Sequence, residues 1–403
     1  MPNVNPKILQ WARVTAGLSI EDAVRQLNIQ PLKGMSQEVR LRELEAGSIH
    51  PTKQMLINMS KKYHRPLVVF YLEKPPIKGN RGEDFRTLPR DFSARDDGLV
   101  DALIRDVLVR QSIVKSAIED DEDTKPLSFV GSTTIEINIK NLADSITNTL
   151  HFDLEKFRKQ STPDNAFKYL RNLVENKEIF VLLMGNLGSW HTNIEAKMFR
   201  GFTLSDNIAP FIVINENDSK SAWSFTLFHE LAHLWLGQTG ISNEDSELAI
   251  EKFCNNVASE VLLPTEDLEL LENITISTNY DETKDRIGAF AHSKNVSGTM
   301  VAYKLFLNRN ISFTTWERLR DDFYSLWQKG KREKRKLNSK KKSGPSYITL
   351  RNYNLGRHLI SFVDQMVSGG DLSTSKASKV LGVSPANLQK LTKLESSLIF
   401  GLG

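Results

Sequence analysis

The sequence predicts a mainly α-helical protein with a small β-sheet, an α+β fold divided among several domains. Apolar residues recur at helical spacing through most of the chain. Three short apolar runs, at 179–184, 199–204 and 211–214, have instead the length and composition of strands. The chain has 403 residues, which is long for one hydrophobic core. We therefore expect two or three domains.

Residues 1–72 are predicted to form a compact helical module. Ser19 and Ser36 each stand at a helix start, and Gly47 follows the second of these helices, where a C-cap favours glycine. A further helix begins at Pro51 and Thr52. The module holds ten Lys or Arg against five Asp or Glu. This balance favours a polyanionic partner, although a solvated basic surface explains it equally well.

A linker or extended arm is predicted at 73–96, where three prolines and two glycines gather. The central domain is expected at 97–328 and contains the three strands. Its principal helices are predicted at 97–123, near 219–236, near 244–263 and in two parts across 283–307. The last two are separated at Asn295-Val296, with Ser297 as the cap of the second.

The C-terminal part begins with a strongly basic stretch. Residues 329–342 hold nine Lys or Arg against one Glu, and we predict a basic tether at 329–345. Residues 346–403 are predicted to form a C-terminal helical module. Its segment 371–391 has in order a predicted helix, a glycine turn, a Ser-Pro cap and a second helix. This order resembles a helix-turn-helix but is also common in packed helices.

Cysteine usage and hydropathy favour a cytoplasmic protein without a membrane segment. Cys254 is the single cysteine, so an intramolecular disulfide framework is excluded and a reducing compartment is favoured. The longest apolar runs are too short to span a bilayer, and the N-terminus lacks the charged and apolar pattern of a signal peptide.

The strongest chemical signal is FTLFHELAHLWLG at 225–237. His229 and His233 are four residues apart, so a helix places both imidazoles on one face, within reach of one metal ion. Glu230 is placed to act on a water molecule as the general base. The surrounding helix is strongly apolar, where two histidines and a glutamate are costly without partners. The alternative is a pair of core histidines with ordinary hydrogen bonds.

A catalytic zinc site needs a third protein ligand. A metzincin would have histidine at position 239, which is Thr239, so that subclass is excluded. Carboxylates of the next helix are the alternative, and the candidates are Glu244, Asp245, Glu247, Glu251 and Glu260. Glu251 is favoured because it falls on the stripe formed by Leu248, Cys254 and Ala258, where a buried carboxylate needs a partner. Asn255 is one turn further on and is expected to hydrogen-bond a ligand. Cys254 is expected to be a small core residue.

Peptide hydrolysis would need an extended substrate and a donor for the oxyanion. Either 199–204 or 209–215 could offer a strand edge beside the metal helix. His191, Tyr303 or an arginine could serve as the donor, and the sequence does not choose among them.

The segments FRGFTLSDNIAPFIVIN, SFTLFHELAHLWLG and IEKFCNNVASEVLLP resemble the ImmA/IrrE family of zinc metallopeptidases. The resemblance covers about 180–310. It implies a zincin-like metallopeptidase core with Zn²⁺ as the cofactor, Glu251 as the third ligand and Asn255 as the following polar position. It also implies a substrate class, because better understood members cleave helix-turn-helix repressors in mobile elements or stress responses.

Residues 7–72 resemble the Cro/CI-type (XRE) helix-turn-helix domain, above all in LRELEAGSIHPT. The resemblance implies a recognition helix near 36–45, with Ser36, Gln37, Arg40 and Arg42 as candidates for contact with DNA. The sequence departs from the family pattern at 30–35, where additional residues separate the two helices. A domain used for protein–protein contact is the alternative.

Two functional hypotheses follow. The first is a zinc-dependent regulatory endopeptidase, with Glu230 as the catalytic base, that cleaves a repressor or an antitoxin-like protein. The second is a DNA-binding transcriptional regulator or antitoxin that uses the peptidase fold as a scaffold or sensor without proteolysis. The partners under these hypotheses are a protein substrate, operator DNA, a toxin and a second copy of the chain.

Overall fold

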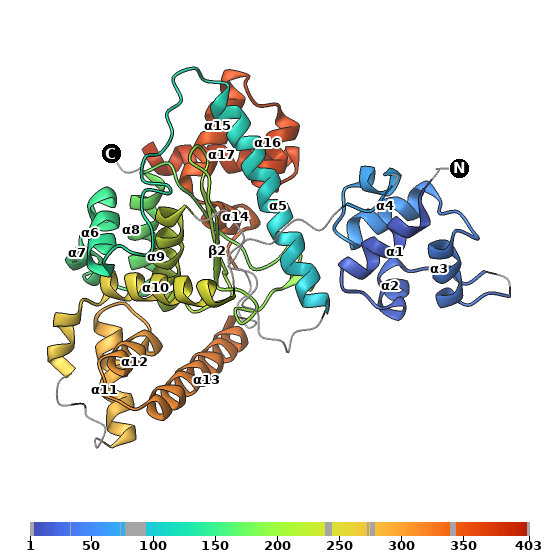
Figure 1. Cartoon of the computed structure of the whole chain (residues 1–403). Coiled ribbons are helices and arrows are strands. Elements are labelled where there is room, and N and C mark those ends of the chain that lie inside the picture. The colour runs from blue at the N-terminus through green and yellow to red at the C-terminus, as the bar shows by residue number, and fades with distance from the viewer. Residues whose placement is uncertain are drawn as a thin grey trace. The chain divides into compact units, whose positions relative to one another are not determined.

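The chain divides into two compact units, which are described separately. The first comprises residues 1–108 and 186–199, and the second comprises residues 109–185 and 200–403. The computed structural model describes residues 4–32, 34–72, 74–76, 94–237, 244–271, 274, 279–338 and 344–400. Helices dominate both units, and a three-stranded sheet lies in the second (Figure 1), so the predicted α+β class is confirmed.

The N-terminal part of the first unit is helical, as predicted. It contains α1 (Pro6–Thr15), α2 (Ile20–Leu27), α3 (Gln37–Ala46), α4 (Lys53–Lys62) and the short 3₁₀ helix η1 (Leu67–Tyr71). The side chains of Ser19, Ser36 and Thr52 accept hydrogen bonds from backbone N–H groups in the first turns of α2, α3 and α4. Because those N–H groups have no partner inside a helix, these caps determine where each helix begins.

Helix α5 (Ala94–Glu119) begins inside the segment predicted as a linker, so its last three residues are helical. Residues 73 and 77–93 of that segment lie outside the described part of the chain. Residues 94–108 of α5 belong to the first unit and residues 109–119 to the second, and the short 3₁₀ helix η3 (Trp190–Thr192) belongs to the first.

The sheet of the second unit has the strand order β1–β3–β2. Strand β1 (Phe180–Leu183) is parallel to β3 (Phe211–Ile214), and β2 (Gly201–Leu204) is antiparallel to β3. The three predicted strands are thus present within two residues at each end. Strand β3 is central and buried, whereas β2 is an edge strand. The Nε2 of Gln111 donates to the carbonyl oxygens of Leu204 and Ala209, at 3.0 and 2.8 Å, and so fixes the turn after β2.

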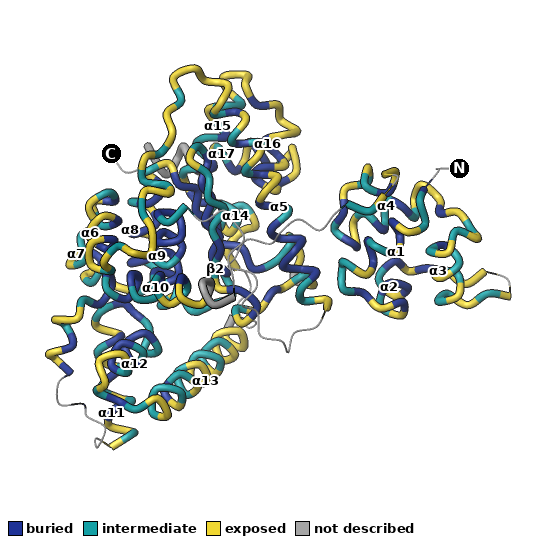
Figure 2. Tube along the Cα trace, in the orientation of Figure 1, coloured by how far each residue is buried: buried dark blue, intermediate teal, exposed yellow. Residues whose placement is uncertain are grey.

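Helices α8 (Pro163–Glu175) and α9 (Lys220–Leu236) pack on this sheet. Further helices of the same unit are α6 (Ile139–Leu150), α7 (Leu154–Arg158), α10 (Glu244–Leu262), η4 (Thr265–Leu271), α11 (Tyr280–Ser293), α12 (Gly298–Leu307) and α13 (Phe313–Asn338). Helix α9 packs against α8, α10, β2 and β3, and Figure 2 shows it as mostly buried. The predicted break between α11 and α12 is present, with Asn295 at φ 57° and Ser297 capping α12.

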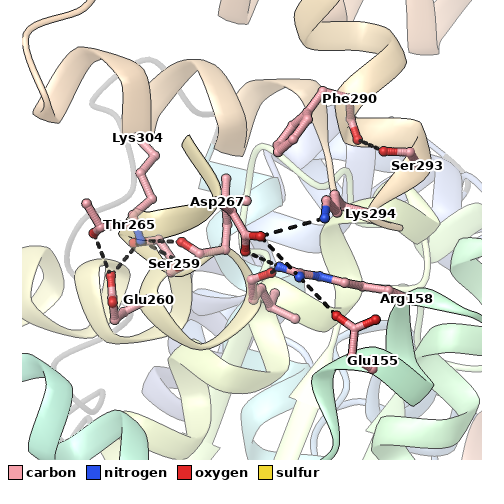
Figure 3. Close-up of polar contacts among 12 residues, drawn as sticks. Glu155, Arg158, Ser259, Glu260, Thr265, Asp267, Phe290, Ser293, Lys294 and Lys304 are labelled. Atoms are coloured by element: carbon pink, nitrogen blue, oxygen red, sulfur yellow. Dashed lines mark hydrogen bonds and ion pairs between the residues drawn. The ribbon is translucent and has the colours of Figure 1, made fainter. Parts of the chain in front are cut away.

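The C-terminal end of α10 is anchored by two basic side chains (Figure 3). Lys304 of α12 donates to the carbonyl oxygens of Ser259 and Leu263 and pairs with Glu260, whose carboxylate lies 2.6 Å from the ammonium. Arg158 of α7 donates to the Leu262 carbonyl at 3.4 Å and pairs with Asp267. The last carbonyls of a helix have few partners within it, so these cations add hydrogen bonds there and hold α10 in place.

The C-terminal helices are α14 (Tyr347–Leu355), α15 (Arg357–Gly369), α16 (Thr374–Leu381) and α17 (Pro385–Phe400). They belong to the second unit, because α14 packs on β1 and α15 packs on α8. Arg171 of α8 donates to the carbonyls of Tyr353 and Asn354, while Glu175 accepts from the N–H groups of Arg357 and His358. These bonds join α8 to the junction of α14 and α15.

A basic tether was predicted at 329–345, but the structure has a helix in the first ten of these residues. Helix α13 continues through 329–338, and Lys331 donates to the Asn217 carbonyl at 2.7 Å. Lysine and arginine have high helix propensity, so a basic run extends a helix as readily as it forms a tether. Among the residues that the structure describes, no helix is long and apolar enough to cross a membrane.

Candidate metal centre

Helices α9 and α10 pack side by side and carry the predicted metal-binding residues. His229 and His233 are one turn apart on α9, and Glu251 lies on the facing surface of α10. Leu227, Phe228 and Leu231, all fully buried, surround the histidines on α9. The apolar composition that favours burial of α9 therefore also removes His229 and His233 from most of their contact with water.

Three donor atoms of these side chains converge. The Nε2 atoms of His229 and His233 lie 3.0 Å apart. Each lies 3.3 Å from a different carboxylate oxygen of Glu251. A tetrahedral ion bound at about 2.0–2.1 Å separates its ligand atoms by roughly 3.3 Å, so these spacings match a shared ion. In the described residues this is also the cluster of His, Cys, Asp and Glu with the geometry to hold a metal.

The electrostatics of the cluster favour an ionised carboxylate. Burial opposes the charge on Glu251, but hydrogen bonds with His229 and His233 outweigh it and hold the pKa of Glu251 below its usual range. A deprotonated carboxylate and two imidazole nitrogens are a donor set that divalent transition metals accept. The residues present thus fit a metal ion.

Glu230 is buried beside this cluster, with 3% of its surface exposed. The Oγ1 of Thr203 on strand β2 lies 2.9 Å from its carboxylate Oε2 and 3.0 Å from its backbone carbonyl oxygen. Gly201 of the same strand faces the other carboxylate oxygen. Sequence reasoning missed Thr203, because no local pattern marks it. A glycine inside a strand does signal a close approach of the backbone, and that signal was present at Gly201.

The structure does not bring the other carboxylates considered for the third ligand to His229 and His233 among the side chains that it describes. Glu260 pairs with Lys304, so it is occupied at the far end of α10. The side chains of Glu244, Asp245 and Glu247 lie outside the described residues. Glu251 was favoured because it falls on a stripe of residues predicted to be buried. That prediction is wrong for Leu248, which is 63% exposed. Leu248 lies in the second turn of α10, where the helix has not yet entered the core formed around Cys254 and Ala258.

Two neighbours of Glu251 have different surroundings. Cys254 is fully buried in the hydrophobic core, as expected of a small core residue. Asn255 is half-buried and lies one turn after Glu251 on α10. The expected contact between Asn255 and a ligand stays a prediction.

The sheet decides which predicted strand could hold a substrate. Strand β3, which contains most of 209–215, is hydrogen-bonded on both sides by β1 and β2. Strand β2, from 199–204, pairs with β3 alone among the described strands, and it packs on α9 beside Glu230. Of the candidate oxyanion donors, Tyr303 packs against Trp316 of α13, and His191 belongs to the first unit.

The candidates for DNA contact all lie on or beside α3. Ser36 is the N-cap of α3, and Gln37 begins the helix. Arg40 turns back and donates from Nη1 to the Gln30 carbonyl at 2.7 Å, so it holds the additional segment between α2 and α3. Arg42 is exposed. Of the two candidate arginines, Arg42 is therefore the one whose side chain lies exposed on the surface.

Residues 191–306 match the family model of the IrrE N-terminal-like domain, Peptidase_M78. The matched segment contains β2, β3 and the helices α9 to α12, and with them His229, Glu230, His233 and Glu251. No curated protein and no solved structure matches the chain. This part of the chain is therefore similar to metallopeptidases of the ImmA/IrrE type, in agreement with the convergence of His229, His233 and Glu251 on one point.

Proposed function

We propose that this protein is a zinc-dependent endopeptidase that uses His229, His233 and Glu251 as metal ligands and Glu230 as the general base. The observation that carries the proposal is the convergence of three donor atoms from two helices, with the buried Glu230 as the residue that directly follows His229. Two imidazoles and one carboxylate are the ligand set of zinc peptidases, which leave a fourth position for water or substrate.

The ion, when bound, supplies Lewis-acid polarisation of the peptide carbonyl and acidifies water. The chain's own groups perform the proton transfers. Glu230 accepts a proton from the attacking water and later delivers it to the amine that leaves, so one carboxylate serves as base and then as acid. Its low exposure excludes competing water and strengthens its interactions with the reacting atoms.

Strand β2 supports binding of an extended peptide. It is an edge strand among the described strands, and other proteins bind a peptide by adding a strand to such an edge. The strand lies against α9 at the level of Glu230, so a peptide paired with it would pass the metal ligands. We therefore place the scissile bond opposite Gly201 to Thr203.

The substrate we propose is a regulatory protein, either a helix-turn-helix repressor or an antitoxin-like protein. Support comes from the similarity of residues 191–306 to the IrrE N-terminal-like domain and from the capped helices α2 and α3 in the first unit. In this proposal the N-terminal helices bring the peptidase to its target, either through operator DNA or through the repressor itself.

The first experiment compares the wild-type protein with Glu230→Gln. Both are loaded with zinc and incubated with a proteome-derived peptide library, and new termini are identified by mass spectrometry. We expect one zinc per chain in both proteins and cleavage by the wild type alone, because glutamine cannot accept the proton. The loss is expected to be at least about 10²-fold.

Cleavage by Glu230→Gln at the wild-type rate would contradict the peptidase assignment. Absence of cleavage by either protein, together with binding of both to a DNA fragment from upstream of the gene, would favour the second candidate, a DNA-binding regulator that uses the peptidase fold as a scaffold.

A further inference from the structure

Strand β2 presents two positions to helix α9. Thr203 contacts Glu230, and Gly201 leaves open the space in which an added Cβ would meet Glu230. The Thr203 hydroxyl lies within hydrogen-bond distance of Oε2, at 2.9 Å, and of the backbone carbonyl oxygen, at 3.0 Å. A hydroxyl that donates to a carboxylate forms one of the stronger hydrogen bonds in proteins, since the acceptor is charged. Because Glu230 is almost wholly buried, its orientation is set by such contacts and not by solvent.

Gly201 leaves the space that the second carboxylate oxygen occupies. A Cβ atom at this position would lie 2.7 Å from Oε1 of Glu230 and 2.6 Å from Cγ2 of Thr226. Both distances are far below the roughly 3.5 Å of an ordinary non-bonded contact. A shift of Thr226 would relieve only one of these two contacts, so the Glu230 carboxylate would also have to move.

We propose that Thr203 is a positioning residue. Its hydroxyl fixes the Glu230 carboxylate in the orientation that accepts a proton from the attacking water, while Gly201 keeps room for the oxygen that Thr203 does not contact. This inference rests on the proposed peptidase function. One strand then holds both reacting partners, because β2 orients the base and its outer edge binds the substrate backbone.

The role predicts a specific kinetic effect. A misplaced base slows the chemical step without weakening the strand pairing that binds substrate, so kcat falls while KM is preserved. Thr203→Val keeps the shape of the side chain and removes the hydroxyl. Thr203→Ser keeps the hydroxyl and removes a methyl group, and it serves as the matched control.

The experiment measures zinc content, kcat and KM for wild type, Thr203→Val and Thr203→Ser with the best-cleaved peptide of the library described above. We expect one zinc per chain throughout and an unchanged KM. Thr203→Val should lower kcat by about 10–100-fold, as expected for a misplacement of about 1 Å, and Thr203→Ser should recover most of the loss. Equal losses in both variants would indicate a merely structural role and would overturn the inference.

Crystal structures of the zinc-loaded proteins give a readout that does not depend on turnover. The Glu230 carboxylate should rotate in Thr203→Val, should be displaced in Gly201→Ala, and should keep its wild-type position in Thr203→Ser. An unmoved carboxylate in Thr203→Val would refute the positioning role. An inactive Glu230→Gln with a fully active Thr203→Val would refute the positioning role alone, whereas an active Glu230→Gln would refute the proposed function.

Discussion

Lys304 shows how one buried side chain fixes the helix that carries Glu251. Its ammonium contacts two backbone carbonyls at the end of α10 and the carboxylate of Glu260, and only 5% of its side chain is exposed. Burial lowers the pKa of Lys304, while the pairing with Glu260 supports its charge. Removing the ammonium would leave the Glu260 charge and two carbonyls without this partner.

Thermodynamic stability tests this role. We expect Lys304→Met to lower the free energy of unfolding by about 3 kcal/mol, because breaking one partner of a buried pair leaves an uncompensated charge. The matched control is Lys140→Met, which removes a lysine from an exposed pair with Glu266, at 3.8 Å. That variant should cost less than about 1 kcal/mol. Similar losses for the two variants in urea unfolding would contradict the anchoring role of Lys304.

At the scale of elements, a half-buried histidine lies where α14 and α15 dock onto β1 and α8. The His358 ring stacks on Phe180 of β1, with ring centroids 4.6 Å apart. Phe362 contacts the Phe180 ring edge-on. Burial lowers the pKa of His358 to about 4. The imidazole is therefore neutral in the folded protein across the physiological range, and its protonation favours the unfolded chain.

The direction of the pH dependence follows. An unfolded histidine titrates near 6.5, so the stability contributed by His358 is present above pH 6.5 and is lost as the pH falls from 6.5 towards 4. At pH 5 the loss should be about 1–2 kcal/mol after allowance for partial exposure. His358→Phe keeps the ring stacking and should lose less stability between pH 7 and pH 5 than the wild type. Identical urea midpoint shifts for the two proteins would contradict this account.

At the scale of the whole molecule, the candidate metal site joins α9 to α10 inside the second unit and leaves the first unit untouched. A ligand that binds only the folded state stabilises that state, so zinc should act on one unit alone. A chain with two compact units also need not unfold in a single step.

Calorimetry of the full chain tests this expectation. Zinc at 100 times its dissociation constant should stabilise the second unit by about 2.7 kcal/mol and raise its transition, and a chelator should reverse the change. His233→Ala should abolish the rise, and magnesium should produce none in the wild type, because Mg²⁺ prefers all-oxygen ligands. A zinc-dependent rise that persists in His233→Ala would place the ion elsewhere.

The sequence by itself determined the features that depend on neighbouring residues. Helix caps at Ser19, Ser36 and Ser297 follow from hydrogen bonds over three residues, and the strands follow from short apolar runs. The His229 and His233 pair follows from helical periodicity alone. For the same reason Glu251 could be favoured from its position on α10, although Leu248, assigned to the same stripe, proved to be exposed.

Only the tertiary structure decided what depends on contacts between distant segments. It placed β3 between two strands and left β2 at the edge, it engaged Glu260 with Lys304, and it continued α13 into the basic run. It also brought Thr203 to Glu230, 27 residues apart. A single threonine carries no periodic signal, so its role became visible only when packing of β2 on α9 closed the distance.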